Sequence, residues 1–227
     1  VGIAESLNQL ANLVDGSEAQ EAYYREALQI NRSLASQDLQ SNGPVLADSL
    51  TGLADFLAKS TDQRIEAAVL YQEAVRTWQA LEDKEARIYQ PKLAISLDKL
   101  ANQLALSKDR AQEAESSYRQ ALQIWQAWSK QDEIASSSNN LANLLTSLPA
   151  RQKEAEALYQ QAVHIWRSLA ASDASTYIPS LADSLTNLAN LLVSLPNRNL
   201  EAQALFQEAL QLQISLAKTD PTSYTPS

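Results

Sequence analysis

The stretch SLTNLANLLVSLPNRNLEAQALFQEALQL (residues 184–212) contains two apolar-periodic segments separated by a polar break. The first segment carries a Leu-Ala-Asn triplet at 188–190, and the second carries Glu-Ala-x-x-Leu-Phe/Tyr-x-x-Ala from residue 201. The same order of landmarks recurs four more times along the chain. Apolar residues at helical spacing in both segments predict a pair of helices, so the chain is predicted to be a repeat protein.

Two landmarks keep nearly one period along the whole sequence. The triplet leucines are spaced by 43, 47, 41 and 47 residues, and they are Leu10, Leu53, Leu100, Leu141 and Leu188. The aromatic residues of the second segment are spaced by 47, 47, 41 and 47 residues, and they are Tyr24, Tyr71, Tyr118, Tyr159 and Phe206. This period predicts stacked units, approximately 1–36, 44–82, 91–129, 132–171 and 179–218, each too small to bury its apolar face alone.

Composition supports an all-helical, soluble chain. Of 227 residues, 45% are hydrophobic, and the low counts of 4 Gly and 7 Pro argue against a fold with many tight turns. No run approaches the ~18 apolar residues that a membrane span needs, and the N-terminus has no signal-peptide pattern, so we expect a cytoplasmic protein. The absence of Cys excludes disulfides and thiolate metal sites. A net charge of −9 argues against nucleic acid or anionic membranes as partners.

Proline and turn residues suggest where the helices begin and end. Pro44, Pro91 and Pro179 are expected in the first turn of the opening helix of three units. Ser147-Leu148-Pro149, Ser194-Leu195-Pro196 and Asp15-Gly16-Ser17 are expected to separate the two helices of a unit. The final Tyr224-Thr225-Pro226-Ser227 repeats the pattern at 177–180. We therefore expect the chain to be a piece excised from a longer array.

Small residues recur at fixed places in both segments. These are the Leu-Ala pairs at 53, 100, 141 and 188, the alanines Ala67, Ala114, Ala155 and Ala202, and the ring-plus-Ala pairs Tyr71/Ala74, Tyr118/Ala121, Tyr159/Ala162 and Phe206/Ala209. The pattern resembles tetratricopeptide repeats, particularly the longer-period kind of kinesin light chains and bacterial arrays. It departs from them in a period above the usual ~34 residues and in Gln20, where Ala is expected. The resemblance implies an all-α solenoid of five antiparallel helix pairs, ten helices in a right-handed superhelix.

A polar stripe runs opposite the apolar face of the first helix of each unit. At 100° per residue, positions five before, two before and two after the triplet leucine lie together on this side. The stripe comprises Asn12, Asp48, Thr51, Asp55, Asp98, Asn102, Asn139, Asn143, Asp183, Thr186 and Asn190, together with Glu5, Asn8, Ile95 and Ser136. Six members are Asn, five are acidic and none is Lys or Arg. In the resembled family this side lines the concave groove.

Two interpretations of the stripe stay open at this stage. An Asn amide offers a donor and an acceptor, which suits the main chain of an extended peptide. Alternatively, the stripe is the solvated side of an amphipathic helix or forms local hydrogen bonds. Asn is a poor helix former, so its recurrence two residues after the leucine calls for a reason. Because the stripe lacks cations, we expect a peptide ligand that is neutral to basic.

Other residues give no sign of a catalytic, metal or cofactor site. Trp78, Trp125 and Trp166 recur seven residues after the tyrosines, on the same side as the rings, which predicts packing between repeats. Trp128 breaks this register. His164 is the only His, no pair among the 27 carboxylates stands out as an acid and base, and no glycine-rich phosphate loop occurs.

The sequence therefore predicts a non-enzymatic scaffold that binds a protein or peptide partner in the groove. An alternative is a regulatory or sensor region of a larger signalling protein with a fused NTPase or protease effector. An enzyme is the third and least supported alternative. Weak end-to-end self-association is also expected, because terminal units of a repeat array present apolar faces.

Overall fold

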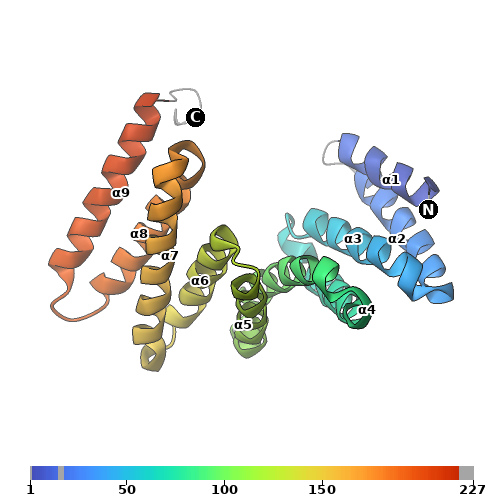
Figure 1. The fold of residues 1–227 in the computed structure, drawn as a ribbon, viewed down its shortest axis with the longest axis horizontal. Coiled ribbons are helices and arrows are strands. Elements are labelled where there is room, and N and C mark those ends of the chain that lie inside the picture. Colours follow the sequence, from blue (N-terminus) through green and yellow to red (C-terminus); the bar gives the residue numbers. More distant parts are fainter. Residues whose placement is uncertain (1, 15–17, 220–227) are drawn as a thin grey trace. The chain divides into compact units, whose positions relative to one another are not determined.

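The computed structural model describes residues 2–14 and 18–219, with the backbone alone for 82–86 and 219, and every regular element in these ranges is helical. Figure 1 shows the helices following one another along the chain. The α-helices are α1 (Gly2–Leu13), α2 (Glu18–Gln37), α3 (Leu39–Leu57), α4 (Arg64–Leu104), α5 (Ala111–Ala127), α6 (Gln131–Thr146), α7 (Gln152–Ser172), α8 (Ala174–Val193) and α9 (Asn199–Thr219). Short 3-10 helices, η1 (Thr61–Gln63), η2 (Lys108–Arg110) and η3 (Pro149–Arg151), precede α4, α5 and α7. The predicted all-α class is confirmed.

The chain divides into two compact units, Val1–Ile124 and Trp125–Ser227. In the first unit α1 packs against α2, α2 against α3, and α3 against α4. In the second unit α6 packs against α7, α7 against α8, and α8 against α9. Packing between helices that are neighbours in sequence is the mark of a helical repeat array. The two expectations that depend on Asp15-Gly16-Ser17 and on residues 224–227 concern positions outside the described residues.

Helix α4 contains two of the predicted helices and reverses direction between them. Asp55 on α3 accepts hydrogen bonds from both Tyr71 and Lys99 of α4. In a straight helix these two residues would lie about 42 Å apart. The rings of Trp78 and Tyr89 are only 5.4 Å apart, which locates the reversal between them. The helix pairs are therefore as predicted, but the expected break before Pro91 is replaced by a helical backbone.

The expected positions of the prolines are wrong, because the helices begin earlier than Pro44 and Pro179. Helix α3 begins at Leu39, where the side chain of Asp38 accepts from the backbone N–H groups of residues 40 and 41. Helix α8 begins at Ala174, where Asp173 accepts from the N–H group of residue 176. A capping carboxylate satisfies N–H groups that have no partner within the helix. Each helix therefore begins five residues before the proline, which lies inside it.

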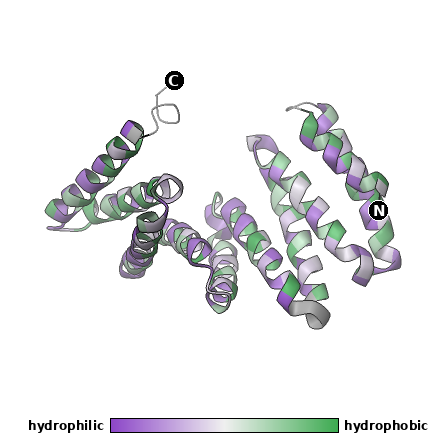
Figure 2. Cartoon of the chain, turned by 45° about the horizontal axis from the view of Figure 1, so that its top comes forward, coloured by the Kyte–Doolittle hydropathy of each residue, from purple (hydrophilic) through white to green (hydrophobic). Residues whose placement is uncertain are grey.

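Small and apolar residues fill the space between paired helices. Ala54, Ala101, Ala142 and Ala189, which follow the triplet leucines, are fully buried, and so are most residues of the opposite alanine column. Figure 2 shows the resulting alternation of hydrophobic and hydrophilic residues along each helix. Four triplet leucines are 5% exposed or less, whereas Leu10 is 45% exposed, so its predicted place in the core is wrong. Its counterpart Leu53 lines the same hollow as Leu28 of the preceding helix pair, and no described pair precedes α1.

The tryptophans pack inside the array, as predicted. Trp78, Trp125 and Trp166 are buried, and Trp128 is half-buried. Trp166 stacks on Tyr177, with ring centroids 5.8 Å apart, and at the equivalent place Trp78 contacts Tyr89 with its ring tilted. Each ring pair therefore fixes the corner at which one helix pair leads into the next.

Candidate functional site

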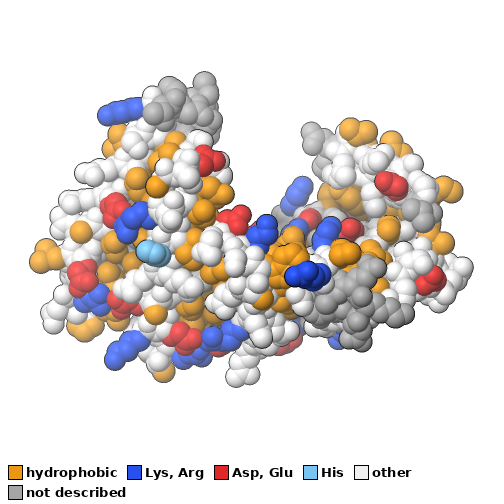
Figure 3. Space-filling model, viewed as in Figure 1, with side chains coloured by type: hydrophobic (Ala, Val, Ile, Leu, Met, Phe, Trp, Pro, Cys, Tyr) orange, Lys and Arg blue, Asp and Glu red, His pale blue; other side chains and the backbone are white. Residues whose placement is uncertain are grey.

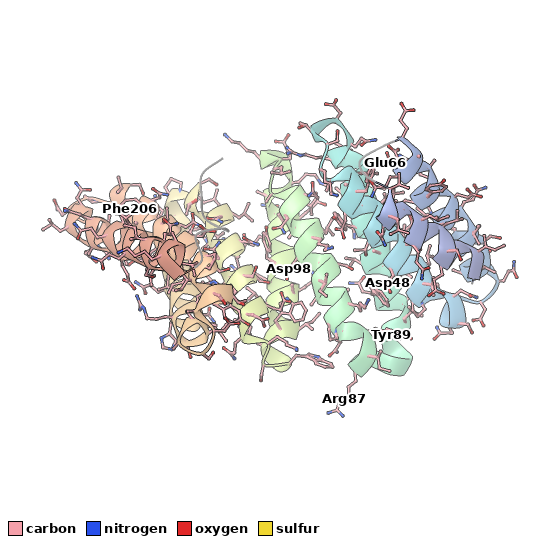
Figure 4. The ribbon with its side chains drawn as sticks, turned by 90° about the horizontal axis from the view of Figure 1, so that it is seen from above. Asp48, Glu66, Arg87, Tyr89, Asp98 and Phe206 are labelled. Carbon is pink, nitrogen blue, oxygen red and sulfur yellow. The ribbon has the colours of Figure 1, made fainter. Side chains whose placement is uncertain are left out.

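The polar stripe lies on the first helix of each pair, as predicted, and all of its members are exposed or half-buried. We call the part of the stripe on each unit the helix A face of that unit. In the first unit it consists of Asn12 on α1, Asp48, Thr51 and Asp55 on α3, and Asp98 and Asn102 on α4. In the second unit it consists of Asn139 and Asn143 on α6, and Asp183, Thr186 and Asn190 on α8. Figure 4 labels Asp48 and Asp98 on the first unit.

The polar residue two positions after the triplet leucine has a partner in its own helix pair in four cases. Its side-chain oxygen accepts a hydrogen bond of 2.5–2.6 Å from the aromatic hydroxyl of the second helix. The pairs are Asn12 with Tyr24, Asp55 with Tyr71, Asn102 with Tyr118 and Asn143 with Tyr159. Local hydrogen bonding, one of the two interpretations of the stripe, therefore explains the role of one side-chain oxygen in each of these four residues.

The tyrosine hydroxyls are the donors in these hydrogen bonds. Burial raises the pKa of Tyr159 to about 12. Burial also raises the pKa of Tyr71, with a further contribution from its hydrogen bond to Asp55, and that of Tyr118, with a contribution from the charge of Asp98. These phenols keep their protons at neutral pH, and an ionised carboxylate can only accept, so Tyr71 donates to Asp55. Asn143 accepts the equivalent hydrogen bond from Tyr159 through Oδ1, so its Nδ2 points away from the tyrosine hydroxyl.

The fifth helix pair lacks this hydrogen bond. Its aromatic residue is Phe206, which has no hydroxyl group, although it lies sixteen residues after Asn190 as in three of the other pairs. Asn190 is exposed on α8. Among the described residues no group forms a hydrogen bond with its side chain, so both its donor and its acceptor face solvent.

Lysines from the following repeat neutralise two acidic residues of the first unit. Lys92 binds Asp48 at 2.9 Å, and Lys99 binds Asp55 at 2.5 Å. Both lysines lie on α4, 44 residues after their partners. The sequence-based picture of an unpaired acidic stripe is therefore wrong for Asp48 and Asp55. Within the described residues, Asp183 of the second unit has no ion-pair partner.

The helix A face of the second unit is built mainly from uncharged polar groups. Asn187 Nδ2 donates to Asn139 Oδ1 at 3.3 Å, which links α8 to α6. The hydroxyl of Thr186 is used within its own helix, where it donates to the carbonyl of Ala182. No described group accepts from Nδ2 of Asn139 or Asn143. This surface therefore presents the side-chain N–H groups of Asn139 and Asn143, whose side-chain oxygens already accept hydrogen bonds.

The second helices of successive pairs are joined by a ladder of ion pairs. Arg25 binds Glu66 at 2.7 Å, and Arg32 binds Glu73 at 2.5 Å, in the first unit. Arg167 binds Glu208 at 2.7 Å in the second unit. Each pair spans 41 residues, one repeat. Figure 3 shows basic and acidic side chains side by side on the visible face. These ion pairs mark the register in which one helix pair follows another.

The described ranges offer no metal site and no membrane span. No group of three or more His, Asp or Glu side chains there could hold a metal ion. None of the described helices is long and apolar enough to cross a membrane. His164 lies on the exposed side of α7.

Sequence reasoning missed the partners of the stripe residues rather than the stripe itself. The constant separation of 16 residues between Asn or Asp and Tyr was present in the sequence as a signal for the hydroxyl bond. The separation of 44 residues between Asp48 and Lys92, and between Asp55 and Lys99, was a weaker signal. The separation of 44 residues predicts an ion pair only when the first helices of successive pairs are known to lie side by side.

Comparisons with known proteins agree with this architecture. Residues 92–168 match the family model of the tetratricopeptide repeat. A substituted form of a putative kinesin light chain from Podosopora anserina, with nearly identical TPR-like repeats, is 23% identical, with a TM-score of 0.65 over 96% of each chain. A second structure of that protein gives 23% identity and a TM-score of 0.63 over 95% of this chain and 96% of its own.

A third solved structure, that of the MamA protein, is 13% identical and has a TM-score of 0.59 over the full length of both chains. No curated protein matches the sequence. The predicted resemblance to tetratricopeptide repeats is confirmed for residues 92–168, and the similar structures confirm the predicted fold of helices packed in sequence order in a repeat array.

Proposed function

We propose that this array of tetratricopeptide repeats is a non-enzymatic protein–protein interaction scaffold that binds an extended peptide segment on its helix A face. The observation that carries the proposal is the state of the asparagines on α6 and α8. Asn139 and Asn143 have their oxygens bonded to Asn187 and Tyr159, while no described group accepts from their N–H groups. Such oriented donors suit the carbonyl groups of a peptide main chain.

The hydrogen bonds that Asn139 and Asn143 accept from Asn187 and Tyr159 also give these donors a fixed position. A side chain that is held at one end loses less conformational freedom when a ligand binds it, so more of the hydrogen-bond energy contributes to affinity. Asn190, with no partner, supplies both a donor and an acceptor on the neighbouring helix. An extended main chain alternates N–H and C=O groups and can use both kinds of partner.

The charges of the two units favour a neutral to basic ligand. In the first unit Lys92 and Lys99 cancel the charges of Asp48 and Asp55. In the second unit no described cation pairs with Asp183, which lies on the same face as the amide groups. A basic side chain of the ligand would therefore pair with Asp183, while its main chain contacts the asparagines. Affinity for such a ligand should fall as salt screens this exposed pair.

Asn143→Asp tests the donor role separately from the structural role. Asp replaces the N–H donor by an oxygen but can still accept from Tyr159, because Asp55 accepts from Tyr71 at the equivalent position. We expect the free energy of unfolding to change little. Binding of peptides selected from a random synthetic library by the parent chain should weaken by about tenfold, the effect of losing a hydrogen bond and gaining an unpaired acceptor.

Ser136→Asp is the matched control, since Ser136 is exposed on the same helix and the change adds the same charge without removing an amide. Equal effects of the two substitutions on peptide affinity would show that charge alone matters. If Asn143→Asp and Asn190→Ala both left the affinity of the selected peptides unchanged, the helix A face would not be the binding surface.

A further inference from the structure

Helix α6 presents two side-chain donors on the helix A face of the second unit. It carries Asn two residues before and two residues after its triplet leucine, at Asn139 and Asn143. Asn139 Oδ1 accepts from Asn187, and Asn143 Oδ1 accepts from Tyr159, whereas no described group accepts from either Nδ2. Helix α1 has Asn at the same two positions, but there Nδ2 of Asn8 donates to a serine of α3 at 3.2 Å. The pair of outward N–H groups therefore distinguishes α6 from α1.

An ordinary peptide segment brings N–H groups to this surface together with its carbonyl groups. In an extended strand the N–H and C=O of one residue point to the same side, so that antiparallel strands exchange both hydrogen bonds. A carbonyl group held by Asn143 therefore places an N–H group against α6 as well. Covering this donor without giving it an acceptor weakens binding, because the donor loses its hydrogen bond to water. The ligand that suits α6 best supplies acceptors without donors.

Two classes of ligand supply acceptors without donors, and charge decides between them. Carboxylates and phosphates form the first class, and proteins bind them with Arg and Lys. Neither α6 nor α8 contains Lys or Arg, and within the described residues Asp183 of α8 has no ion-pair partner. An anion is therefore repelled at this face. The second class is a main chain rich in proline, since proline has a carbonyl group and no N–H.

We propose that the helix A face of the second unit selects a proline-rich peptide segment with a basic residue at one end. This proposal rests on the proposed function, because it specifies the ligand of the same surface. The prolines lie over α6, where their carbonyl groups accept from Nδ2 of Asn139 and Asn143. The basic residue lies over α8, where its side chain pairs with Asp183. Asn190 offers a donor and an acceptor to the main chain of that residue.

A proline-rich segment also lowers the entropy cost of binding. It adopts the polyproline II conformation before it binds, and this helix has no internal hydrogen bonds to break. Little further ordering is needed, so more of the hydrogen-bond energy contributes to affinity. On the protein side, the side chains of Asn139 and Asn143 are held by the hydrogen bonds of their oxygens. Both partners are therefore ordered in advance.

Three synthetic peptides of equal length test the role of the missing N–H group with the full chain. Each carries one arginine at the same end. The rest of the first is proline, the rest of the second is alanine, and the rest of the third is N-methylalanine, which lacks the N–H group but has no ring. We expect the first and third peptides to bind at least about tenfold more tightly than the second, as measured by fluorescence anisotropy. If only the proline peptide binds tightly, the ring is recognised instead of the missing N–H group, and the proposal is overturned.

Substitutions in the chain assign the preference to α6. Asn143→Asp removes the N–H donor but keeps an oxygen that can accept from Tyr159, and it should weaken binding of the proline peptide about tenfold. Asn139→Asp should have the same effect. Gln131→Glu is the matched control, since it makes the same change from amide to carboxylate at an exposed residue of α6 outside the helix A face. Circular dichroism confirms that each variant folds. A control that weakens binding as much would mean that charge alone is responsible, and this overturns the proposal.

The basic end of the ligand is tested separately. Replacing the arginine of the proline peptide by glutamine should weaken binding about two- to fivefold at low salt, the range of an exposed ion pair. The same replacement should have no effect on binding to the Asp183→Asn chain. If the arginine contributes equally in both chains, it does not pair with Asp183, and the proposed placement of the ligand is overturned.

Failure of this proposal can be told from failure of the proposed function. If the alanine peptide binds at least as tightly as the proline peptide, and Asn143→Asp weakens both, the helix A face binds peptides without selecting proline. The same holds if none of the three peptides binds while peptides selected from the random library bind and depend on Asn143. Either result overturns this proposal alone. If Asn143→Asp and Asn190→Ala weaken no peptide that binds, both proposals are overturned.

Discussion

Tyr71 donates a 2.6 Å hydrogen bond to the carboxylate of Asp55, sixteen residues earlier in the same helix pair. The ammonium group of Lys99, from the next pair, binds the same carboxylate at 2.5 Å. One acidic side chain thus connects the two helices of a repeat and joins that repeat to its successor. In three other pairs asparagine replaces the carboxylate, and the hydroxyl bond remains while the lysine is absent at the equivalent site.

Tyr159→Phe should reduce the free energy of unfolding by about 0.5–1.5 kcal/mol, the net value of one hydrogen bond. The ring stays in place, because Phe206 occupies the same position in the last pair. Urea unfolding followed by circular dichroism measures the change. Tyr177→Phe is the control, since Tyr177 stacks on Trp166 and no described group hydrogen-bonds its hydroxyl. A loss as large for the control would show that the hydroxyl bond to Asn143 is not the cause.

Alkaline pH should weaken the fold through the same tyrosines. Burial raises the pKa of Tyr159 from 10.0 to about 12. The unfolded chain therefore loses this proton at lower pH than the folded chain, and the free energy of unfolding falls as pH rises from 10 to 12. The stability advantage of the parent over Tyr159→Phe should shrink across this range, as measured by urea unfolding at each pH. A constant advantage would mean that Tyr159 ionises equally in both states.

The helical pattern alone predicts most of the fold and the faces of its helices. Leucines at 53, 100, 141 and 188 are buried as their spacing indicates, and the stripe opposite them is accessible. Leu10 has the same spacing and is exposed, because burial of this column also requires a preceding helix pair. Periodicity predicts which face of a single helix is apolar. Whether another helix pair covers that face depends on the position of the pair in the array.

Boundaries and partners were harder to predict for physical reasons. Residues 82–90 contain no Gly or Pro, so the backbone stays helical through the corner where α4 reverses direction. The carboxylates of Asp38 and Asp173 start their helices before the prolines that had suggested the boundary. Lys99 can pair with Asp55 only because α3 and the second half of α4 lie next to each other. That neighbourhood is set by the packing of the folded array and cannot be read from either helix alone.

Leu188→Ala and Leu10→Ala form a pair of substitutions in one sequence column with different environments. Leu188 is buried between helices, so its truncation should cost about 2–5 kcal/mol through lost contacts and a cavity. Leu10 is half-exposed, and its truncation should cost less than about 1.5 kcal/mol. Chemical unfolding of the two variants measures both values. Equal costs would contradict the burial that distinguishes the first helix pair from the fifth.

Phe206→Tyr should restore the one missing rung of the hydroxyl series. The sixteen-residue separation from Asn190 matches the spacing of Tyr159 from Asn143, so the new hydroxyl should reach Asn190 Oδ1. Because Phe206 is partly exposed, we expect a gain of about 0.5 kcal/mol, the lower end for a hydrogen bond. The gain should vanish in an Asn190→Ala background, as a double-mutant cycle in urea would show. A gain that persists without Asn190 would come from the ring environment instead, and no gain at all would mean that the α8–α9 pair does not share the geometry of the other pairs.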